Sequence, residues 1–426
     1  MAWLWVFAVA CGSDDASDSQ KPAKDAGSDV EVYAGDDAGD AATCAASGVS
    51  KRPWVQHVTE TSALVRWEAC AEGSDPGLTF SPEAGGASQT VQSTVKSVDI
   101  PNTYAAAFQP QLPKDEAGRY YMHDATLTGL AAGACYSYAL SADASQKGRF
   151  CTARPSGASF KILATGDTNP GLGATPKLLG FVKDEGYDLT LHAGDVQYYA
   201  SGLETWVTWF QLMEPMLAQG AFLPAVGNHE YEKPDEFPLY YQRFFDQAGF
   251  DGQDGYFRAQ SGGVWFFFWN TEIDDGPTSA QFAWFQANLA DAAKQPGYRF
   301  SIFVLHKPML TCGDKSQNDS LRATLQPLFE QYAVPLVLQG HMHGYERFEV
   351  PMQSDATKAI TYLTIGGGGG ALEDIDKNID RPTCQLRQAK GKMYQMTVLE
   401  VGTGKLSGRT IDVQGTERDT FEKAVP

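Results

Sequence analysis

Residues 227–230 read Gly227-Asn228-His229-Glu230 and directly follow the apolar run 221–226. Against average composition, such a fixed tetrapeptide should arise by chance in a chain this long on the order of once in several hundred trials. A polar residue that follows a buried strand lies at the carboxyl end of a sheet, which is where open α/β sheets bind their ligands. The motif therefore predicts an α/β domain with a site at one edge of its sheet.

Four further motifs with polar residues follow strand-like runs in the same part of the chain. They read Gly166-Asp167, Gly194-Asp195-Val196-Gln197-Tyr198, His306 and Gly340-His341-Met342-His343. The five apolar runs span 161–165, 189–193, 221–226, 301–305 and 335–338, and helix-like stretches lie near 175–184, 203–217, 279–293 and 319–332. This alternation predicts an α/β sheet in which the five strand ends converge.

The residue types in these motifs favour metal chemistry. Carboxylate, amide and imidazole groups together suit first-row metals such as iron, zinc or manganese. One carboxylate can bridge two ions about 3.5 to 4 Å apart, so that both can bind the same phosphate group. In a strand-like segment, His341 and His343 at positions i and i+2 point the same way. We therefore expect the polar side chains to gather around a pair of cations.

The preceding part of the chain, from about residue 44 to 153, reads as a series of short strands. In residues 62–69 alternate side chains fall on one face, as in a sandwich strand with a buried tryptophan; they are Ala63, Val65, Trp67 and Ala69. Residues 130–138 carry the Leu, Gly and Tyr spacing of a tyrosine corner. These features predict a fibronectin type III-like or immunoglobulin-like β-sandwich that packs against its neighbour.

The five motifs, the continuation Gly344-Tyr345-Glu346-Arg347 and the aromatic run 263–268 resemble the purple acid phosphatases, and the similarity covers residues 160–414. The resemblance implies an all-β sandwich followed by a four-layer α/β/β/α metallophosphoesterase domain. It implies a ferric ion bound by Asp167, Tyr198 and His343, a divalent ion (zinc, iron or manganese) bound by Asn228, His306 and His341, and Asp195 as the bridge. The implied reaction is hydrolysis of phosphate monoesters by a metal-bound hydroxide, best at acidic pH.

Tyr198 discriminates between pairs of metals. A free tyrosine has a pKa of about 10, and only a strong Lewis acid such as Fe(III) would hold it as phenolate at neutral pH. With Asp167, Asp195 and Tyr198 as anions, a ferric and a divalent ion leave two positive charges, and a bound hydroxide leaves one, which suits an incoming phosphate. The alternative is that Tyr198 or Tyr199 only packs in its loop.

Protonation of the leaving group is where the sequence departs from the resemblance. The family places further histidines several residues beyond the metal-binding one, whereas His306 is followed by the stretch from Lys307 to Lys315 without a histidine. Three other histidines are expected to be structural: His57, His123 and His192. His229 is then the candidate general acid and, with Asn228, a candidate phosphate contact. Lys307 or Lys315 would help to bind substrate.

The overall charge limits the partners of the chain. Its 426 residues include 33 basic and 52 acidic side chains, which give a net charge of -19. A nucleic-acid or anionic-membrane surface would need clustered lysine and arginine, so neither partner is expected. The expected partner is a small phosphate ester that metal ions or a few cations attract locally, and the sequence indicates no oligomeric state.

The N-terminus indicates export. Residues 1–11 are an apolar run shorter than the roughly 20 residues that span a bilayer. Small residues Ala8 and Ala10 before Cys11 resemble a bacterial lipobox, which predicts a signal peptide and a lipid anchor as the membrane contact; the alternative is an ordinary cleaved signal or an unprocessed tail. Residues 12–43 hold nine acidic residues against Lys21 and Lys24 and predict a disordered linker. The chain is expected to be a cell-envelope lipoprotein or a periplasmic or secreted protein.

Six cysteines remain when Cys11 is set aside, which suits three disulfides in an oxidising compartment. Six cysteines allow 15 pairings. We expect pairing between sequence neighbours: Cys44 with Cys70, Cys135 with Cys151, and Cys312 with Cys384. The expected domains are the sandwich at 44–154, the catalytic domain at 158–415 and a C-terminal tail at 416–426.

Two other functions compete with phosphomonoester hydrolysis. A phosphodiesterase or nucleotidase could use the same scaffold. In a non-catalytic surface binding protein, the sandwich would recognise a partner and the second domain would be vestigial, although a complete ligand set argues against this.

The glycine run 366–370 formally fits a dinucleotide-binding pattern, but residues 372–376 do not open an amphipathic helix, so we do not expect a dinucleotide site.

Overall fold

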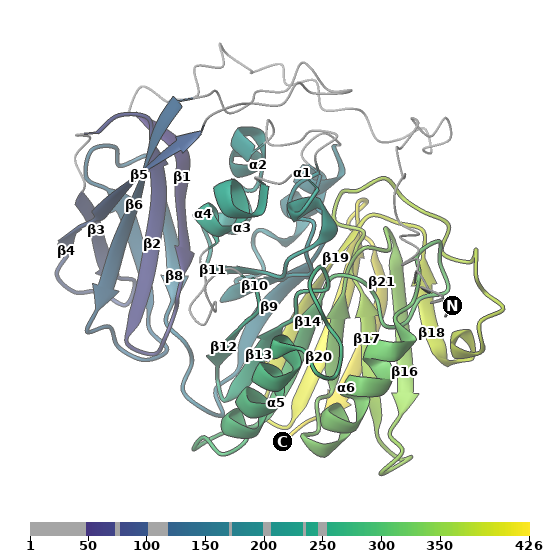
Figure 1. Ribbon diagram of the computed structural model, residues 1–426. Coiled ribbons are helices and arrows are strands. Elements are labelled where there is room, and N and C mark those ends of the chain that lie inside the picture. The colour runs from purple at the N-terminus through teal and green to yellow at the C-terminus, as the bar shows by residue number, and fades with distance from the viewer. Residues whose placement is uncertain are drawn as a thin grey trace, which may run out of the picture.

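The computed structural model describes residues 48–72, 77–100, 118–169, 173–198, 206–232, 236–245 and 254–426. A β-sandwich lies beside a larger α/β body with two sheets (Figure 1). The predicted signal segment, the acidic linker and Cys44 lie outside the described residues. Within the part of the chain described, no helix is both long and apolar enough to cross a membrane.

Three sheets make up the described strands. The largest has the order β21-β20-β19-β9-β10-β11-β1-β2-β6-β5. Its strands are β1 (Val49–Gln56), β2 (Ser62–Ala69), β5 (Thr94–Ile100), β6 (Gly118–Thr128), β9 (Phe160–Thr165), β10 (Leu189–His192), β11 (Ala221–Pro224), β19 (Gln395–Gly402), β20 (Lys405–Asp412) and β21 (Glu417–Ala424).

The two smaller sheets have the orders β12-β13-β14-β15-β17-β16-β18 and β4-β3-β7-β8. The first contains β12 (Phe257–Ser261), β13 (Val264–Phe268), β14 (Phe300–Leu305), β15 (Leu336–Gln339), β16 (Tyr345–Pro351), β17 (Ala359–Thr364) and β18 (Arg387–Gly391). The second contains β3 (Gly77–Pro82), β4 (Gln89–Gln92), β7 (Cys135–Leu140) and β8 (Lys147–Cys151).

Helices cover the outer faces of the two larger sheets. They are α1 (Ala174–Val182), α2 (Trp206–Leu212), α3 (Glu214–Leu217) and α4 (Gln242–Phe244) on one side, and α5 (Ala280–Ala292) and α6 (Asp319–Gln331) on the other. Three short turns of other helix types are η2 (Asn228–Glu230), η3 (Phe237–Tyr241) and η4 (Pro382–Leu386). The helix-like stretch predicted near 203–217 is helical in the described residues but divided in two, because α2 ends at Leu212 and α3 begins at Glu214, with Pro215 in its first turn.

Alternating side chains along the strands separate the layers. On β14, Ile302 and Val304 join the apolar core between the two sheets, whereas Phe303 joins the core beneath α5 and α6. On β9, Ile162 faces the same inter-sheet core and Leu163 faces the core beneath α1 to α4. The layers are therefore helix, sheet, sheet, helix, which confirms the predicted α/β/β/α domain.

The sandwich has a core of its own and shares a sheet with its neighbour. Trp67 is buried in the sandwich core, and the Tyr136 hydroxyl accepts the backbone N–H of Ala131 at 2.9 Å, which confirms the tyrosine corner. Strand β1 pairs in parallel with β11 through Val55 and Ala221. Trp54, also on β1, joins the core beneath α1 to α4. The sandwich therefore packs firmly against the α/β body, as predicted.

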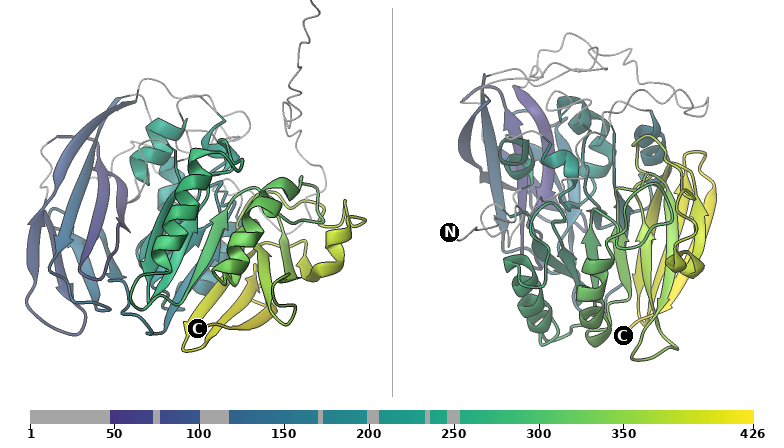
Figure 2. Two further views of the ribbon diagram at one scale, coloured as in Figure 1. Left: turned by 60° about the horizontal axis from the view of Figure 1, so that its bottom comes forward. Right: turned by 45° about the vertical axis from the view of Figure 1, so that its right-hand side comes forward.

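The C-terminus corrects one prediction. Residues 417–424 form β21, which pairs with β20 at the edge of the largest sheet instead of forming a tail. Figure 2 shows these yellow strands on the side of the molecule away from the purple sandwich.

Two of the expected disulfides are confirmed: Cys135 bonds Cys151, and Cys312 bonds Cys384. Cys70 is also disulfide-bonded, but its predicted partner Cys44 lies outside the described residues. The Cys135–Cys151 bond joins the neighbouring sandwich strands β7 and β8. The Cys312–Cys384 bond joins the loop after β14 to η4.

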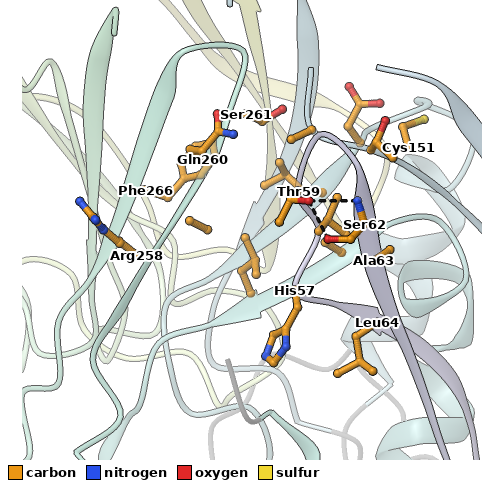
Figure 3. A pocket seen from close by; sticks show the side chains of 18 of the residues that line it. His57, Thr59, Ser62, Ala63, Leu64, Cys151, Arg258, Gln260, Ser261 and Phe266 are labelled. Atoms are coloured by element: carbon orange, nitrogen blue, oxygen red, sulfur yellow. Dashed lines mark hydrogen bonds between the residues drawn. The ribbon is translucent and has the colours of Figure 1, made fainter. Parts of the chain in front are cut away.

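A cavity of about 560 Å³ lies between the sandwich and the α/β body. In Figure 3, His57, Thr59 and Leu64 of the sandwich lie on one side of it, and Arg258 and Gln260 of β12 on the other. None of the predicted metal ligands lines this cavity. The candidate site therefore lies elsewhere, at the carboxyl ends of the parallel strands.

Candidate metal centre

The five predicted motifs follow five parallel strands, and the structure brings them together. Strands β9, β10 and β11 are parallel neighbours in one sheet, and β14 and β15 are parallel neighbours in the other. Because the two sheets lie face to face, the carboxyl ends of both supply side chains to the same place. Backbone hydrogen bonds join the loops, since Asp167 N–H donates to Gly194 O at 3.0 Å and Gly340 N–H donates to His306 O at 2.9 Å.

Three of the predicted ligands have left-handed backbones. The φ angles are 58° at Asp167, 50° at Asp195 and 66° at His341. Such angles are uncommon for residues other than glycine and persist only where the surroundings enforce them. The prediction of a strand-like segment at His341 and His343 was wrong, because β15 ends at Gln339 and β16 begins at Tyr345. The two histidines still reach the site, but in two different ligand groups.

The first group centres on His306. Its Nε2 lies 3.0 Å from Asn228 Oδ1, 3.2 Å from His341 Nδ1 and 3.2 Å from Asp195 Oδ2. Its Nδ1 lies 2.8 Å from the carbonyl oxygen of Ala193, which can only accept a hydrogen bond. Nδ1 therefore carries the proton, and in neutral His306 the lone pair of Nε2 faces the other donor atoms. This is how a histidine is oriented for a metal.

The second group centres on His343 and Tyr198. The Tyr198 hydroxyl lies 2.6 Å from His343 Nε2 and donates to Asp167 Oδ1 at 2.9 Å. His343 Nδ1 lies 2.7 Å from the carbonyl oxygen of Ala371, so its Nε2 is also directed into the group. Tyr198 is buried, with 5% of its surface exposed, and it does not merely fill the loop, because its hydroxyl reaches both partners.

Asp195 belongs to both groups. Potential ligand atoms of Asp195, His306 and His341 lie within 4.8 Å of one another, and those of Asp167, Asp195 and His343 do the same. Asp195 Oδ1 accepts the backbone N–H of His229 at 3.0 Å, whereas Oδ2 faces His306 Nε2 at 3.2 Å and His229 Nε2 at 3.8 Å. A buried carboxylate oxygen that faces imidazole nitrogens fits a cation between the two groups.

Electrostatics favour positive charge at this place. Burial alone would lower the pKa of His306, but the Asp195 carboxylate raises it to about 10. The space between these two side chains therefore favours a positive charge. Burial, Asp167 and Asp195 raise the pKa of Tyr198 well above its ordinary value. A phenolate can therefore exist there only beside a strong cation. The donor set fits a pair of metal ions.

His229 and Lys307 lie at the margin of the ligand groups. His229 Nε2 lies 3.8 Å from Asp195 Oδ2, and its Nδ1 lies 2.8 Å from Glu232 Oε2. Burial is the main cause that lowers the pKa of His229 to about 4. Lys307 Nζ pairs with Glu272 at 2.8 Å. Two of the three histidines expected to be structural have such contacts, since His123 stacks on Trp67 and His192 packs against Phe222, whereas His57 lines the cavity beside the sandwich.

Two glutamates at the site were not assigned from the sequence. The buried Glu230 carboxylate accepts the backbone N–H groups of Asp195, Val196 and Gly227 at 3.1, 2.8 and 2.7 Å. The position of Glu230 in the Gly-Asn-His-Glu motif was the sequence feature from which a role at the site could have been predicted. Glu373 accepts the backbone N–H of His343 at 3.1 Å, and no sequence pattern marked it.

Comparison with known proteins identifies the domain that carries these residues. Residues 160–345 match the family described as calcineurin-like phosphoesterase. The chain has a calcineurin-like phosphoesterase domain. The matched residues run from β9 to the first residue of β16 and contain all seven predicted ligands.

Several curated relatives of the chain are purple acid phosphatases. Purple acid phosphatase 22 of Arabidopsis thaliana is 25% identical over 241 residues, which cover 54% of this chain and 55% of the relative. Probable purple acid phosphatase 20 of the same plant is 27% identical over 215 residues, which cover 47% of this chain and 49% of the relative. The chain thus spans about half the length of the curated relatives it matches.

A solved structure extends the likeness to most of the fold. The purple acid phosphatase PPD1 from yellow lupin (Lupinus luteus) seeds has a TM-score of 0.71, covering 88% of this chain and 75% of the lupin chain at 19% identity. The strand-rich N-terminal region and the phosphoesterase domain therefore share their arrangement with that enzyme.

Proposed function

We propose that the protein hydrolyses phosphate monoesters at a binuclear metal centre of the purple acid phosphatase type. The observation that carries the proposal is the place of Asp195 in both ligand groups, because one carboxylate between two sets of donors is what a pair of neighbouring cations requires. The purple acid phosphatase relatives support the choice of reaction.

The two groups of side chains would hold different ions. Asn228, His306 and His341 offer nitrogen and neutral oxygen donors for a divalent ion such as zinc, iron or manganese, and Asp195 would bridge. The remaining donors, which include the phenol oxygen that favours a ferric ion, are Asp167, Tyr198 and His343. When bound, the ions would acidify a water molecule and neutralise charge on the phosphoryl oxygens.

The residues beside the ligands would handle the substrate. Asn228 and His229 follow β11 at the edge of the groups, and the His229 imidazole is 19% exposed, so it can meet a substrate. We assign His229 as the group that protonates the leaving oxygen. Because its pKa is lowered to about 4, this role would be filled in acid. Lys307 pairs with Glu272 and would contact substrate through a remaining N–H of its ammonium group.

We also propose that the protein is exported. The two described disulfides support an oxidising compartment, where such bonds persist. The sequence resemblance to a lipobox favours a lipid-anchored protein of the cell envelope. The tyrosine corner supports a fibronectin type III-like identity for the sandwich.

Metal analysis combined with ester hydrolysis tests the proposal. The full chain would be loaded with iron and zinc and assayed with p-nitrophenyl phosphate and with its bis ester from pH 4 to 8. We expect about two metals per chain and faster turnover of the monoester than of the diester. Asp195→Asn should lose both the metals and the hydrolysis. Faster turnover of the diester would replace the phosphomonoesterase proposal with a phosphodiesterase. A metal-loaded protein that hydrolyses neither ester would overturn the catalytic proposal.

A further inference from the structure

The loop after β14 brings a cation to the edge of the candidate centre. Lys315 Nζ pairs with Glu373 Oε1 at 2.8 Å, and each side chain is only 16% exposed. The other oxygen of Glu373 accepts the backbone N–H of His343 at 3.1 Å, and the Glu373 N–H donates to His343 O at 3.0 Å. Glu373 therefore links the ammonium group of Lys315 to a predicted metal ligand.

The backbone of this loop is fixed on several sides. Arg381 donates through Nη1 to Thr311 O at 2.8 Å and through both Nη atoms to Lys315 O at 3.1 Å. Asn378 Nδ2 donates to Gly313 O at 2.6 Å. The disulfide between Cys312 and Cys384 joins the same two segments. A lysine held in this way loses little further freedom when it binds a ligand.

The charge of Lys315 reaches the centre. The ammonium group is one residue away from the centre, because its partner Glu373 holds the backbone of His343 through two hydrogen bonds. Lys307, the other lysine considered from the sequence, pairs with Glu272. Of the two lysines, Lys315 is the one whose carboxylate partner also contacts a predicted metal ligand, His343.

We propose that Lys315 binds a non-bridging phosphoryl oxygen of the substrate and thereby favours phosphate monoesters over diesters. The proposal rests on the function proposed above and goes beyond it by assigning the residue that sets the substrate class. A monoester dianion carries one more anionic oxygen than a diester, and an ammonium group is a strong donor to such an oxygen. Glu373 positions the ammonium group.

Substitution of Lys315 tests this assignment in the metal-loaded full chain. Lys315→Met removes the charge at similar side-chain length, and Lys315→Arg keeps it. The matched control is Lys358→Met, since Lys358 is 68% exposed and pairs only locally with Asp355 in the described contacts. Calorimetry would measure the binding of inorganic phosphate, kinetics would give kcat/KM for p-nitrophenyl phosphate and its bis ester, and metal content would be measured for each protein.

We expect Lys315→Met to weaken phosphate binding and to lower monoester kcat/KM by about 10- to 100-fold, as for loss of a charged hydrogen bond. The diester kcat/KM should fall less, Lys315→Arg should recover part of the loss, and metal content should stay unchanged. Equal losses for both esters, or unchanged phosphate binding, would overturn the assignment. Loss of metal in Lys315→Met would also overturn it, because Lys315 would then support His343 through Glu373 instead of binding phosphate.

The calorimetric measurement separates this proposal from the proposed function. If the wild-type protein hydrolyses neither ester but binds phosphate more tightly than Lys315→Met does, the hydrolase proposal fails while the anion site at Lys315 stands. If the wild-type protein hydrolyses the monoester and Lys315→Met does so equally well, the hydrolase stands and the role of Lys315 fails.

Discussion

The carboxylate of Glu230 accepts the backbone N–H of Asp195 at 3.1 Å and so ties the residue shared by both ligand groups to the loop after β11. The same oxygen accepts the N–H of Gly227 at 2.7 Å, and the other oxygen accepts the N–H of Val196 at 2.8 Å. One buried side chain thus fixes the spacing between the loops after β10 and β11. Asn228 and Asp195, which belong to the same ligand group, depend on that spacing.

Glu230→Gln should weaken metal binding by about 10- to 100-fold, the range found when groups that orient metal ligands are changed. A glutamine offers one acceptor oxygen, and its amide group would face a backbone N–H without accepting from it. Titration of the metal-free protein with zinc would measure the loss. Glu400→Gln, at an exposed position of β19, is the control and should bind zinc like wild type. Unchanged affinity in Glu230→Gln would show that the loops hold their spacing without this carboxylate.

Gly227→Ala should disrupt the centre through a single methyl group. A Cβ at Gly227 would collide with Asp195 Oδ1, although the φ angle of -114° is open to any residue. We expect weaker metal binding and a loss of about 1 to 3 kcal/mol in the free energy of unfolding, as for overpacked sites. Gly180→Ala is the matched control, because a Cβ at Gly180 in α1 meets nothing within 4 Å. That variant should be more stable by about 0.5 to 1 kcal/mol; equal metal affinity in both variants would contradict the prediction.

Removal of metal should destabilise the wild-type protein. At a metal concentration about 100-fold above Kd, binding to the folded state contributes about 2.7 kcal/mol, which corresponds to roughly 5 to 10 °C in Tm for a domain of this size. We expect a chelator to lower the Tm of the wild-type protein by this amount and to leave the Tm of Asp195→Asn unchanged. Differential scanning calorimetry would measure both. A chelator effect of equal size in the two proteins would mean that the metal binds outside the groups shared by Asp195.

Tyr198→Phe should remove a visible absorption band from the iron-loaded protein. The Tyr198 hydroxyl lies between Asp167 and His343, and a ferric ion there would bind it as phenolate, which gives iron–tyrosinate proteins their colour. Tyr187→Phe is the control, because Tyr187 is buried in the core beneath α1 to α4, away from the ligand groups. It should keep the band. A band that persists in Tyr198→Phe would exclude this tyrosine as an iron ligand.

The sequence could place the predicted ligands near one another because each of their motifs begins within a few residues of the end of its strand. A buried strand such as β10 is a short apolar run, and the loop after it must lie at the edge of the sheet, so Asp195 could be assigned to that edge from local pattern alone. The Cys135–Cys151 pair was predictable for a similar reason, since the two residues belong to neighbouring strands only 16 positions apart.

Features that depend on tertiary contacts were not predictable. Strand β21 has Phe421 as its one buried hydrophobic side chain, so its pattern resembles a polar tail, and it is a strand because its backbone pairs with β20. The left-handed backbone of His341 is enforced by its N–H, which donates to both oxygens of Asp167 at 3.0 Å. The link from Lys315 through Glu373 joins residues 58 positions apart, and neither residue lies in a recognisable motif.

Glu68→Gln should uncouple the sandwich from the phosphoesterase domain. Glu68 of β2 is buried and pairs with Lys51 at 3.1 Å and with Arg243 of α4 at 3.0 Å, so the variant leaves buried cations unpaired at a cost of about 3 to 5 kcal/mol. Burial alone would raise the pKa of Glu68, but Arg243 and Lys51 outweigh it and lower the pKa below its ordinary value. The stabilisation is therefore fully present above the unfolded pKa of about 4.3 and is lost as pH falls through the lower folded value.

Urea unfolding would measure this effect. The free energy of unfolding should differ between wild type and Glu68→Gln at pH 7, and this gap should close in acid. Glu83→Gln, which breaks the partly exposed pair with Arg149, should cost less than about 1 kcal/mol at pH 7; a gap for Glu68→Gln that stays constant with pH would show that the loss comes from packing and not from charge.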